Sequence, residues 1–264
     1  FGIDTVLSIK AAMLFLFVHA FYKAALFMIA GFIDKKTGTR DWRELGGLYR
    51  YMPITFGISL LALFSMAGLP PMLGFLGKEL IYEAKVQLPD FAQFILVFGV
   101  AGNALMIAVS MFFLFKVFLG KTSKKPQISY KKDWAFVIGP AILALLSLFF
   151  GLFPDILGKA IIEPALISIR KVAYNVELKL WHGFNNVFFL SVLTVFLGFV
   201  LFWIIYKKNL ILDKWRTVNQ NFFTIKLVDV FDNTLNSFLN LSKRKTKLVQ
   251  HGYHRYYILT IFVV

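Results

Sequence analysis

Long apolar runs alternate with short charged segments along most of the chain. Several runs reach the roughly 20 residues that an α-helix needs to cross a bilayer. Apolar residues are continuous within each run and do not alternate with polar ones, as they would in the strands of a barrel. Because only helices and closed barrels satisfy their backbone groups in lipid, the pattern predicts an all-α, polytopic transmembrane helix bundle. The five predicted spans are residues 9–33, 53–84, 91–119, 134–153 and 186–206.

The pattern changes after residue 206. Over residues 207–250, apolar side chains recur every three or four positions with polar ones between them, which predicts an amphipathic helix on the membrane face or along neighbouring helices. Residues 251–264 begin with aromatic and basic side chains and are expected to start a further transmembrane helix. Residues 1–206 are therefore expected to form one transmembrane module. The chain lacks an initial Met and ends within an apolar run, so we interpret it as an internal piece of a longer polypeptide.

The second predicted span is interrupted near its middle by Gly68, Pro70 and Pro71. Two successive prolines remove two backbone donors and clash with the preceding turn, so they predict a helix break. Backbone groups freed inside a membrane are tolerated where protein or a water-filled cavity satisfies them. Lys78 and Glu79 follow about two turns later. Two interpretations fit this pattern equally well: an ion site at mid-membrane, or an interfacial turn with Lys78 at the water boundary.

His19 and Lys23 lie near the middle of the first span, four residues and so one turn apart on one helical face. A lysine at the centre of a span costs about 2.5–3.5 kcal/mol on insertion, so it usually faces a polar path or a partner. An apolar environment disfavours its charged form, and a histidine exchanges its proton near neutral pH. We interpret the pair as steps of a proton relay, with Lys78 and Glu79 as the next station or the exit. The alternative is a structural pair bonded to carbonyl groups of neighbouring helices.

The net charge of the chain and its distribution indicate which kind of partner the chain binds. The net charge of the 264 residues is +15, from 29 Lys and Arg against 14 Asp and Glu. In a soluble protein this excess would suggest nucleic acid, but these cations lie mostly in loops between apolar spans. The distribution follows the positive-inside rule, so we expect the lipid bilayer as a partner and no nucleic acid. Residues 34–51, 120–133 and the tail after 206 fall on one side, which should be cytoplasmic.

The candidate chemistry is not that of a soluble enzyme. The sequence has no cysteine, which excludes disulfides, thiolate metal sites and thiol redox chemistry. It also lacks a phosphate-binding loop and a paired-histidine metal motif, so we expect no enzyme activity, no cofactor and no metal site. Asn103, in the third span, could join helices by hydrogen bonds or belong to a polar path, and we favour the helix link.

Two stretches carry a family resemblance: HAFYKAALFMIAGFIDKKTGTRDWRELGGL and MPITFGISLLALFSMAGLPPMLGFLGKEL. They resemble the large A subunit of Mrp-type multi-subunit sodium/proton antiporters, which is similar to the antiporter-like membrane subunits of respiratory complex I. The resemblance is strongest over residues 9–84 and continues more weakly beyond them. The TGTRD loop and the run SMAGLPP…GFLGKE favour the Mrp subunit over its complex I counterparts.

The resemblance implies a function and a set of residues. It implies proton translocation coupled to Na+ efflux, in a multi-pass protein of the cell membrane that is partnered by the other subunits of the complex. His19 and Lys23 match the central proton-pathway helix of the family, and Lys78 matches the terminal lysine of its broken helix, with Glu79 beside it. Residues 207–250 resemble the lateral helix that clamps neighbouring subunits.

This sequence also departs from the family pattern. Phe15 stands where relatives often carry another histidine, and the earlier helices with their Glu–Lys pair lie upstream, so this piece is not expected to transport alone. Two rival functions stay open. The same module could work in a complex I-type NADH–quinone oxidoreductase or a membrane-bound hydrogenase, or the chain could be a scaffold without conduction.

Overall fold

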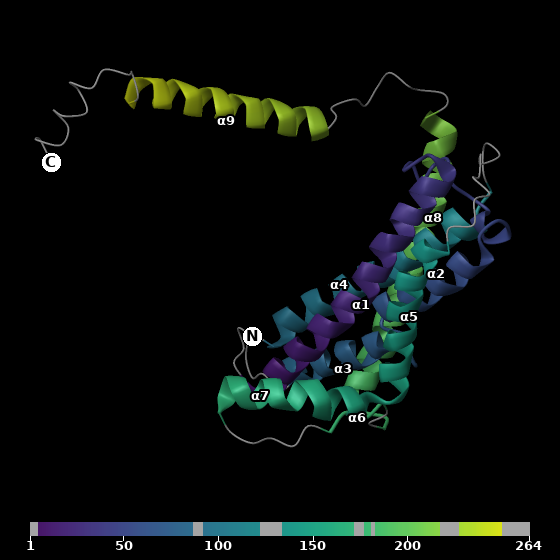
Figure 1. Ribbon diagram of the computed structural model, residues 1–264, viewed down its shortest axis with the longest axis vertical. Helices are drawn as coiled ribbons and strands as arrows, with labels where there is room; N and C mark the ends of the chain where they lie inside the picture. Colours follow the sequence, from purple (N-terminus) through teal and green to yellow (C-terminus); the bar gives the residue numbers. More distant parts are fainter. Residues whose placement is uncertain are drawn as a thin grey trace, which may run out of the picture. The chain divides into compact units, whose positions relative to one another are not determined.

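The computed structural model describes residues 5–86, 92–121, 134–171, 177–180, 183–216 and 227–249, and within these ranges the chain forms helices and turns and no strand. The all-α prediction is therefore confirmed. The chain separates into two units, Phe1–Asn209 and Leu210–Val264. Residues 251–264, expected to start a further span, lie outside the described residues. The helices are α1 (Val6–Thr37), η1 (Leu48–Arg50), α2 (Pro53–Met66), α3 (Leu73–Val86), α4 (Ala92–Phe113), η2 (Leu114–Leu119), α5 (Ala135–Leu152), α6 (Pro154–Leu157), η3 (Gly158–Ile162), α7 (Glu163–Arg170), α8 (Asn186–Arg216) and α9 (Leu227–Val249) (Figure 1).

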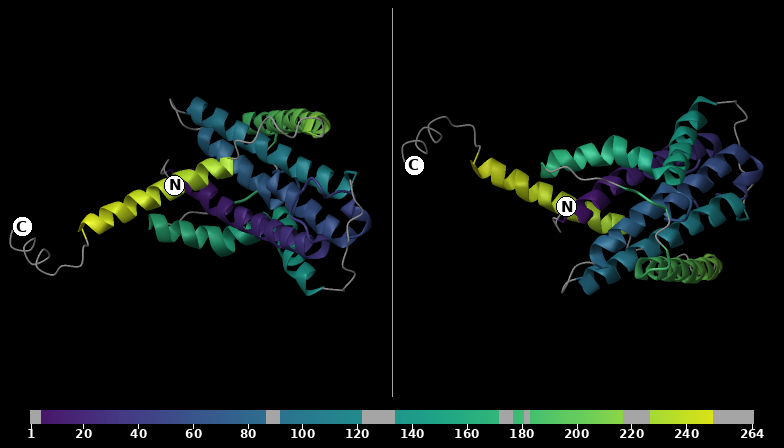
Figure 2. Two further views of the ribbon diagram at one scale, coloured as in Figure 1. Left: turned by 90° about the horizontal axis from the view of Figure 1, so that it is seen from above. Right: turned by 90° about the horizontal axis from the view of Figure 1, so that it is seen from below.

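Unit 1 is a bundle of apolar helices. Among the described residues, the helices long and apolar enough to cross a membrane are Val6–Thr37, Phe94–Leu119, Ala135–Leu152 and Asn186–Lys207. α2 is also apolar but shorter, and α1 packs against α2, α3 and α5. In both views of Figure 2, α8 lies at one edge of unit 1 and α7 at the opposite edge, with α1, α3 and α4 between them. The chain is thus a polytopic membrane protein.

α1 has well-defined ends and one packed face. The hydroxyl groups of Thr5 and Ser8 each accept a hydrogen bond from the other residue's backbone N–H, which satisfies donors at the helix start. The helix ends at Gly38, whose φ of 70° is in the left-handed region that favours glycine. Buried residues recur every three or four positions, so one stripe faces the core. This stripe comprises Leu14, Val18, Tyr22, Ala25 and Ile29.

The second predicted span consists of two helices, α2 and α3, separated by residues 67–72. Pro70 and Pro71 lie in this interruption, and neither could continue α2 because each lacks a backbone N–H. Gly68 has a φ of 63°, a conformation that costs other residues more than glycine. The interruption therefore has a local cause in all three residues.

The interruption is packed tightly against α5. Gly74 of α3 approaches the carbonyl group of Ser65, and Gly151 of α5 approaches the carbonyl group of Pro71, so closely that a Cβ at either glycine would overlap these atoms. The hydroxyl groups of Ser65 and Ser147 lie 2.8 Å apart in a buried hydrogen bond that joins the end of α2 to α5. These contacts hold the ends of α2 and α3 against one surface of α5.

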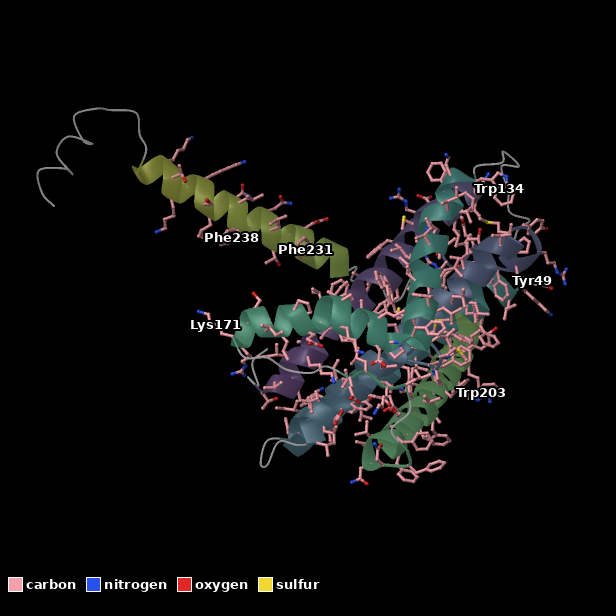
Figure 3. The ribbon with its side chains drawn as sticks, turned by 60° about the horizontal axis from the view of Figure 1, so that its bottom comes forward. Tyr49, Trp134, Lys171, Trp203, Phe231 and Phe238 are labelled. Carbon is pink, nitrogen blue, oxygen red and sulfur yellow. The ribbon has the colours of Figure 1, made fainter. Side chains whose placement is uncertain are left out.

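At one end of unit 1, the loop after α1 lies beside η2 and the start of α5. The ring of Trp42 lies 5.2 Å from that of Phe112, and the Lys116 Nζ lies 5.7 Å from the Trp42 ring. Figure 3 shows Tyr49 and Trp134 at this same end. Tryptophan and tyrosine favour the membrane–water interface, so this end is suited to that level.

The last turns of α8 within unit 1 reach the same end, since the Phe202 ring lies 5.2 Å from the Phe115 ring of η2.

The loop after α1 carries local ion pairs, among them one between the Arg43 guanidinium and the Asp41 carboxylate at 2.6 Å. Hydrogen bonds donated by Arg43 lower the pKa of Asp41 to about 2, so this carboxylate stays ionised at physiological pH. A Cβ on Gly47 would lie 3.5 Å from the carbonyl oxygen of Gly120, so the described parts of two cationic segments predicted to share one side of the membrane, 34–51 and the beginning of 120–133, meet at one end of unit 1.

Unit 2 contains the amphipathic helix α9. Residues 207–250, expected to form a single amphipathic helix, are divided between the end of α8 and α9, and residues 217–226 lie outside the described part of the chain. Phe231 and Phe238 are exposed and stand seven residues apart, so they share a face of α9 (Figure 3). Leu235 is also exposed between them, which makes this face an apolar stripe.

Candidate functional site

Lys78 lies early in α3 and is buried, with 4% of its surface exposed. Its Nζ donates a hydrogen bond to the carbonyl oxygen of Gly68 at 2.8 Å and lies 5.2 Å from the centre of the Phe75 ring. A Cβ on Gly68 would lie 3.1 Å from the Lys78 Cδ, so the glycine leaves room for the lysine side chain. A buried amine needs a hydrogen-bond partner, and the interrupted helix supplies one from its backbone.

Glu79 lines a cavity of about 70 Å³ that is separate from the Lys78 amine. The wall on α3 includes Glu79 and Glu83, and the facing wall includes Glu177, Lys179 and Asn185. The lining also includes apolar side chains such as Leu76 and Leu80, and a cavity of this size has room for a few water molecules. Among the described residues, no three His, Cys, Asp or Glu side chains are grouped so that they could hold a metal ion.

The far wall of the cavity is fixed by two contacts to other elements. The Lys10 Nζ donates to the carbonyl oxygen of Glu177 at 2.9 Å, and the Leu178 N–H donates to the Asp155 carboxylate at 3.0 Å. Leu178 itself is buried in the core. Because α8 begins beside the cavity and passes η2 near its other end, the cavity lies toward the end of unit 1 opposite the cationic loop.

His19 and Lys23 lie on a less buried face of α1. The His19 Nδ1 is 2.9 Å from the Tyr22 hydroxyl group, and the tautomer of the imidazole decides which of the two donates. The Lys23 Nζ lies 5.7 Å from the ring of Phe27, which is 72% exposed. His19 is exposed and Lys23 partly so, which leaves this face of α1 open within the described part of the chain.

The four predicted residues form two groups, one on α1 and one on α3. The two helices cross where Gly77 of α3 meets Val18 of α1, because a Cβ on this glycine would lie 3.2 Å from the valine. His19 and Lys78 are the next residues along their helices. The described contacts of His19 and Lys23 are to α1 itself, whereas Lys78 contacts the backbone of the helix break.

Several polar groups in the interior of unit 1 were not predicted from the sequence. Tyr22, three residues after His19, could have been found from helical spacing. Gly68 acts through its backbone carbonyl, which leaves no side-chain signature. Tyr82 and Thr194 bond each other between α3 and α8, and Thr194 stood out only as a polar residue inside an apolar run. Asn103 donates to Tyr82, in line with the favoured helix link.

Comparison with known families gives a match over the first part of the chain. Residues 1–106 match the family described as NADH:quinone oxidoreductase/Mrp antiporter, TM. This range contains α1, α2, α3 and most of α4, and thus all of the candidate residues on α1 and α3.

Relatives resemble nearly the whole chain. It is 35% identical over 97% of its length to the A subunit of the Na(+)/H(+) antiporter from Alkalihalophilus pseudofirmus, and 34% identical over 96% to the protein of the same name from Bacillus subtilis. The chain spans 33% of the length of each of these relatives. A chain in the structure of the Mrp complex from Dietzia sp. matches with a TM-score of 0.65 and 27% identity, covering 99% of this chain and 28% of that one.

Proposed function

Residues 1–106 belong to the NADH:quinone oxidoreductase/Mrp antiporter membrane family, and on this premise we propose that the chain is part of a membrane subunit of a multi-subunit cation/proton antiporter. Its role is to form part of a proton path across the cell membrane that is coupled to Na+ efflux. Its partners are the other subunits of that complex and the lipid bilayer. We assign it transport of protons and no enzymatic turnover.

The observation that carries this proposal is the burial of the Lys78 amine. Its amine is buried at an interrupted helix and is bonded to the Gly68 carbonyl oxygen at 2.8 Å. Burying a lysine costs free energy, and inside a membrane an ionisable residue marks an ion or proton path by default. A lysine that merely marked the membrane boundary would extend to water, whereas this one points into the protein.

His19 and Lys23 form a second proton-exchanging group in the proposal. They stand one turn apart on α1, and α1 packs against α3, the helix that carries Lys78. Their face of α1 is open, and the relatives are about three times as long as this chain. We assign the cover of this face to helices from the rest of the subunit or from its partners.

Glu79 is the proposed exit group for protons that leave Lys78. It is the next residue on α3 and lines the cavity at the end of unit 1 opposite the cationic loop. A carboxylate beside a few water molecules can take up and release a proton, so Glu79 connects the buried amine to that side. With the cationic loop in the cytoplasm, the cavity faces outward.

The alternative is a proton-pumping subunit of a complex I-type NADH–quinone oxidoreductase or a membrane-bound hydrogenase, since the family description covers both groups. The relatives that resemble nearly the whole chain are named as antiporter subunits, and the similar structure is of an Mrp complex. These similarities favour the antiporter. The alternative predicts flavin and iron–sulfur subunits encoded beside this chain, whereas the antiporter predicts small membrane subunits.

Lys23→Ala tests the proposal in the full-length protein within its complex. We expect sodium-dependent proton flux in everted vesicles to fall by about 100-fold, the scale on which a positioned proton-transfer group contributes. Lys35→Ala is the matched control, because Lys35 lies in the last turn of the same helix. Its Nζ is 3.7 Å from the centre of the Phe136 ring. Unchanged flux in Lys23→Ala with normal assembly would support a scaffold instead.

A further inference from the structure

Three polar side chains from three helices meet in the apolar interior of unit 1. The hydroxyl groups of Tyr82, on α3, and Thr194, on α8, lie 2.8 Å apart, and the Asn103 amide of α4 donates to the Tyr82 oxygen at 2.9 Å. Tyr82 and Thr194 are fully buried, each 0% exposed. Residues 82 and 194 are 112 positions apart in the chain, so this cluster is a tertiary link and not a local turn.

The direction of each hydrogen bond in the cluster can be assigned. Thr194 donates its single hydroxyl proton to the carbonyl oxygen of Leu190 at 2.7 Å, so Tyr82 must be the donor to Thr194. The Tyr82 oxygen is then free to accept from Asn103. The phenol uses both its donor and its acceptor capacity, and removing its hydroxyl group takes a partner from both neighbours.

The cluster is placed to control the position of Lys78. Tyr82 follows Lys78 by four residues, so the two side chains leave one face of α3 a single turn apart. α3 is 14 residues long and starts directly after the helix break. The same face of this short helix is therefore attached at two points, by Lys78 to the Gly68 carbonyl and by Tyr82 to α4 and α8.

The chemistry of the cluster favours a positional role over proton transfer. The Asn103 amide donates to Tyr82 but cannot pass on a proton as a carboxylate or an imidazole does. At the other end, the Thr194 proton is committed to a helix carbonyl. Both ends of the chain of hydrogen bonds are therefore closed.

We propose that Tyr82, held by Asn103 and Thr194, is a positioning residue that fixes α3 so that the Lys78 amine stays on the Gly68 carbonyl. This inference rests on the proposed function, in which Lys78 exchanges protons. The titratable group beside Lys78 on α3 is Glu79, the next residue along the helix. The break beside Lys78 contributes an uncharged group, the Gly68 carbonyl.

The test is the pH dependence of sodium-dependent proton flux in everted vesicles, with the full-length protein in its complex. Tyr82→Phe keeps the ring and removes the hydroxyl group, and Thr194→Val removes the acceptor with little change in shape. Both variants are expected to move the midpoint of the pH–flux curve by about half a unit or more, which is a threefold change in the proton affinity of Lys78. Thr194→Ser retains the hydroxyl group and is expected to keep the wild-type midpoint.

Tyr206→Phe is the matched control, because the centre of the Tyr206 ring lies 5.4 Å from that of Phe202 in a tilted pair outside the cluster. A purely structural cluster would lower the amount of assembled complex in Tyr82→Phe and Thr194→Val without moving the midpoint, and that result overturns the inference. If Tyr82→Phe does not assemble, the comparison of Thr194→Val with Thr194→Ser decides alone. If the wild-type complex shows no sodium-dependent flux, the proposed function has failed; wild-type flux with unmoved midpoints refutes the positioning role only.

Discussion

Sodium-dependent proton flux is expected to fall by about 100-fold or more in full-length protein carrying Lys78→Met, with the complex still assembled. Methionine keeps an unbranched side chain in the buried space and removes the amine that we propose exchanges protons. The Gly68 carbonyl group loses its partner, which costs about 1–3 kcal/mol of stability. The substitution does not leave a buried charge, so the cost should not prevent folding. Everted vesicles with a pH-sensitive dye measure the flux, and an immunoblot of the membranes measures how much of the protein is present.

Lys207→Met is the control for this substitution, since Lys207 is exposed near the end of α8 in unit 1. It changes the same functional group in the same way, and its flux should match that of the wild type. Flux in Lys78→Met within about twofold of the wild type, at equal amounts of protein, would contradict the role of Lys78 in the path. Such a result would also remove the basis for the positioning role of Tyr82.

Gly74→Ala is expected to destabilise the protein by about 1–3 kcal/mol and to lower the amount of assembled complex. The added Cβ would overlap the carbonyl group of Ser65, which is backbone and cannot rotate away. The end of α2 and the start of α3 would have to separate, and the Ser65–Ser147 hydrogen bond to α5 would be strained or lost. The thermal midpoint of the purified complex in detergent measures the loss.

Gly102→Ala is the matched control, because a Cβ at this position of α4 meets no atom within 4 Å. The same chemical change there should be neutral or slightly stabilising, since alanine favours helix over glycine. Equal thermal midpoints for Gly74→Ala and Gly102→Ala would show that the helix break tolerates separation, and the account of its packing would be wrong.

His19 and Lys23 on α1 show what helical spacing in the sequence can and cannot predict. The four-residue spacing of His19 and Lys23 correctly places them one turn apart, because a continuous apolar run folds as one helix. Spacing could not show that their face is open in the described structure, since the cover of a helix face comes from elements far away in the sequence. It could not have found the Thr194 partner of Tyr82 either, 112 residues further on.

By itself the sequence determined the helical class and most helix positions, because in lipid a backbone must satisfy its own hydrogen bonds and long apolar runs leave few alternatives. It also determined where the second span is interrupted, since proline lacks the N–H that a helix needs. Only the tertiary structure showed that Lys78 is buried, with its amine bonded to the Gly68 carbonyl oxygen. The physical reason is that burial depends on Gly68, Gly74 and Gly151 letting backbones approach closely, and such approach is set by packing between distant helices.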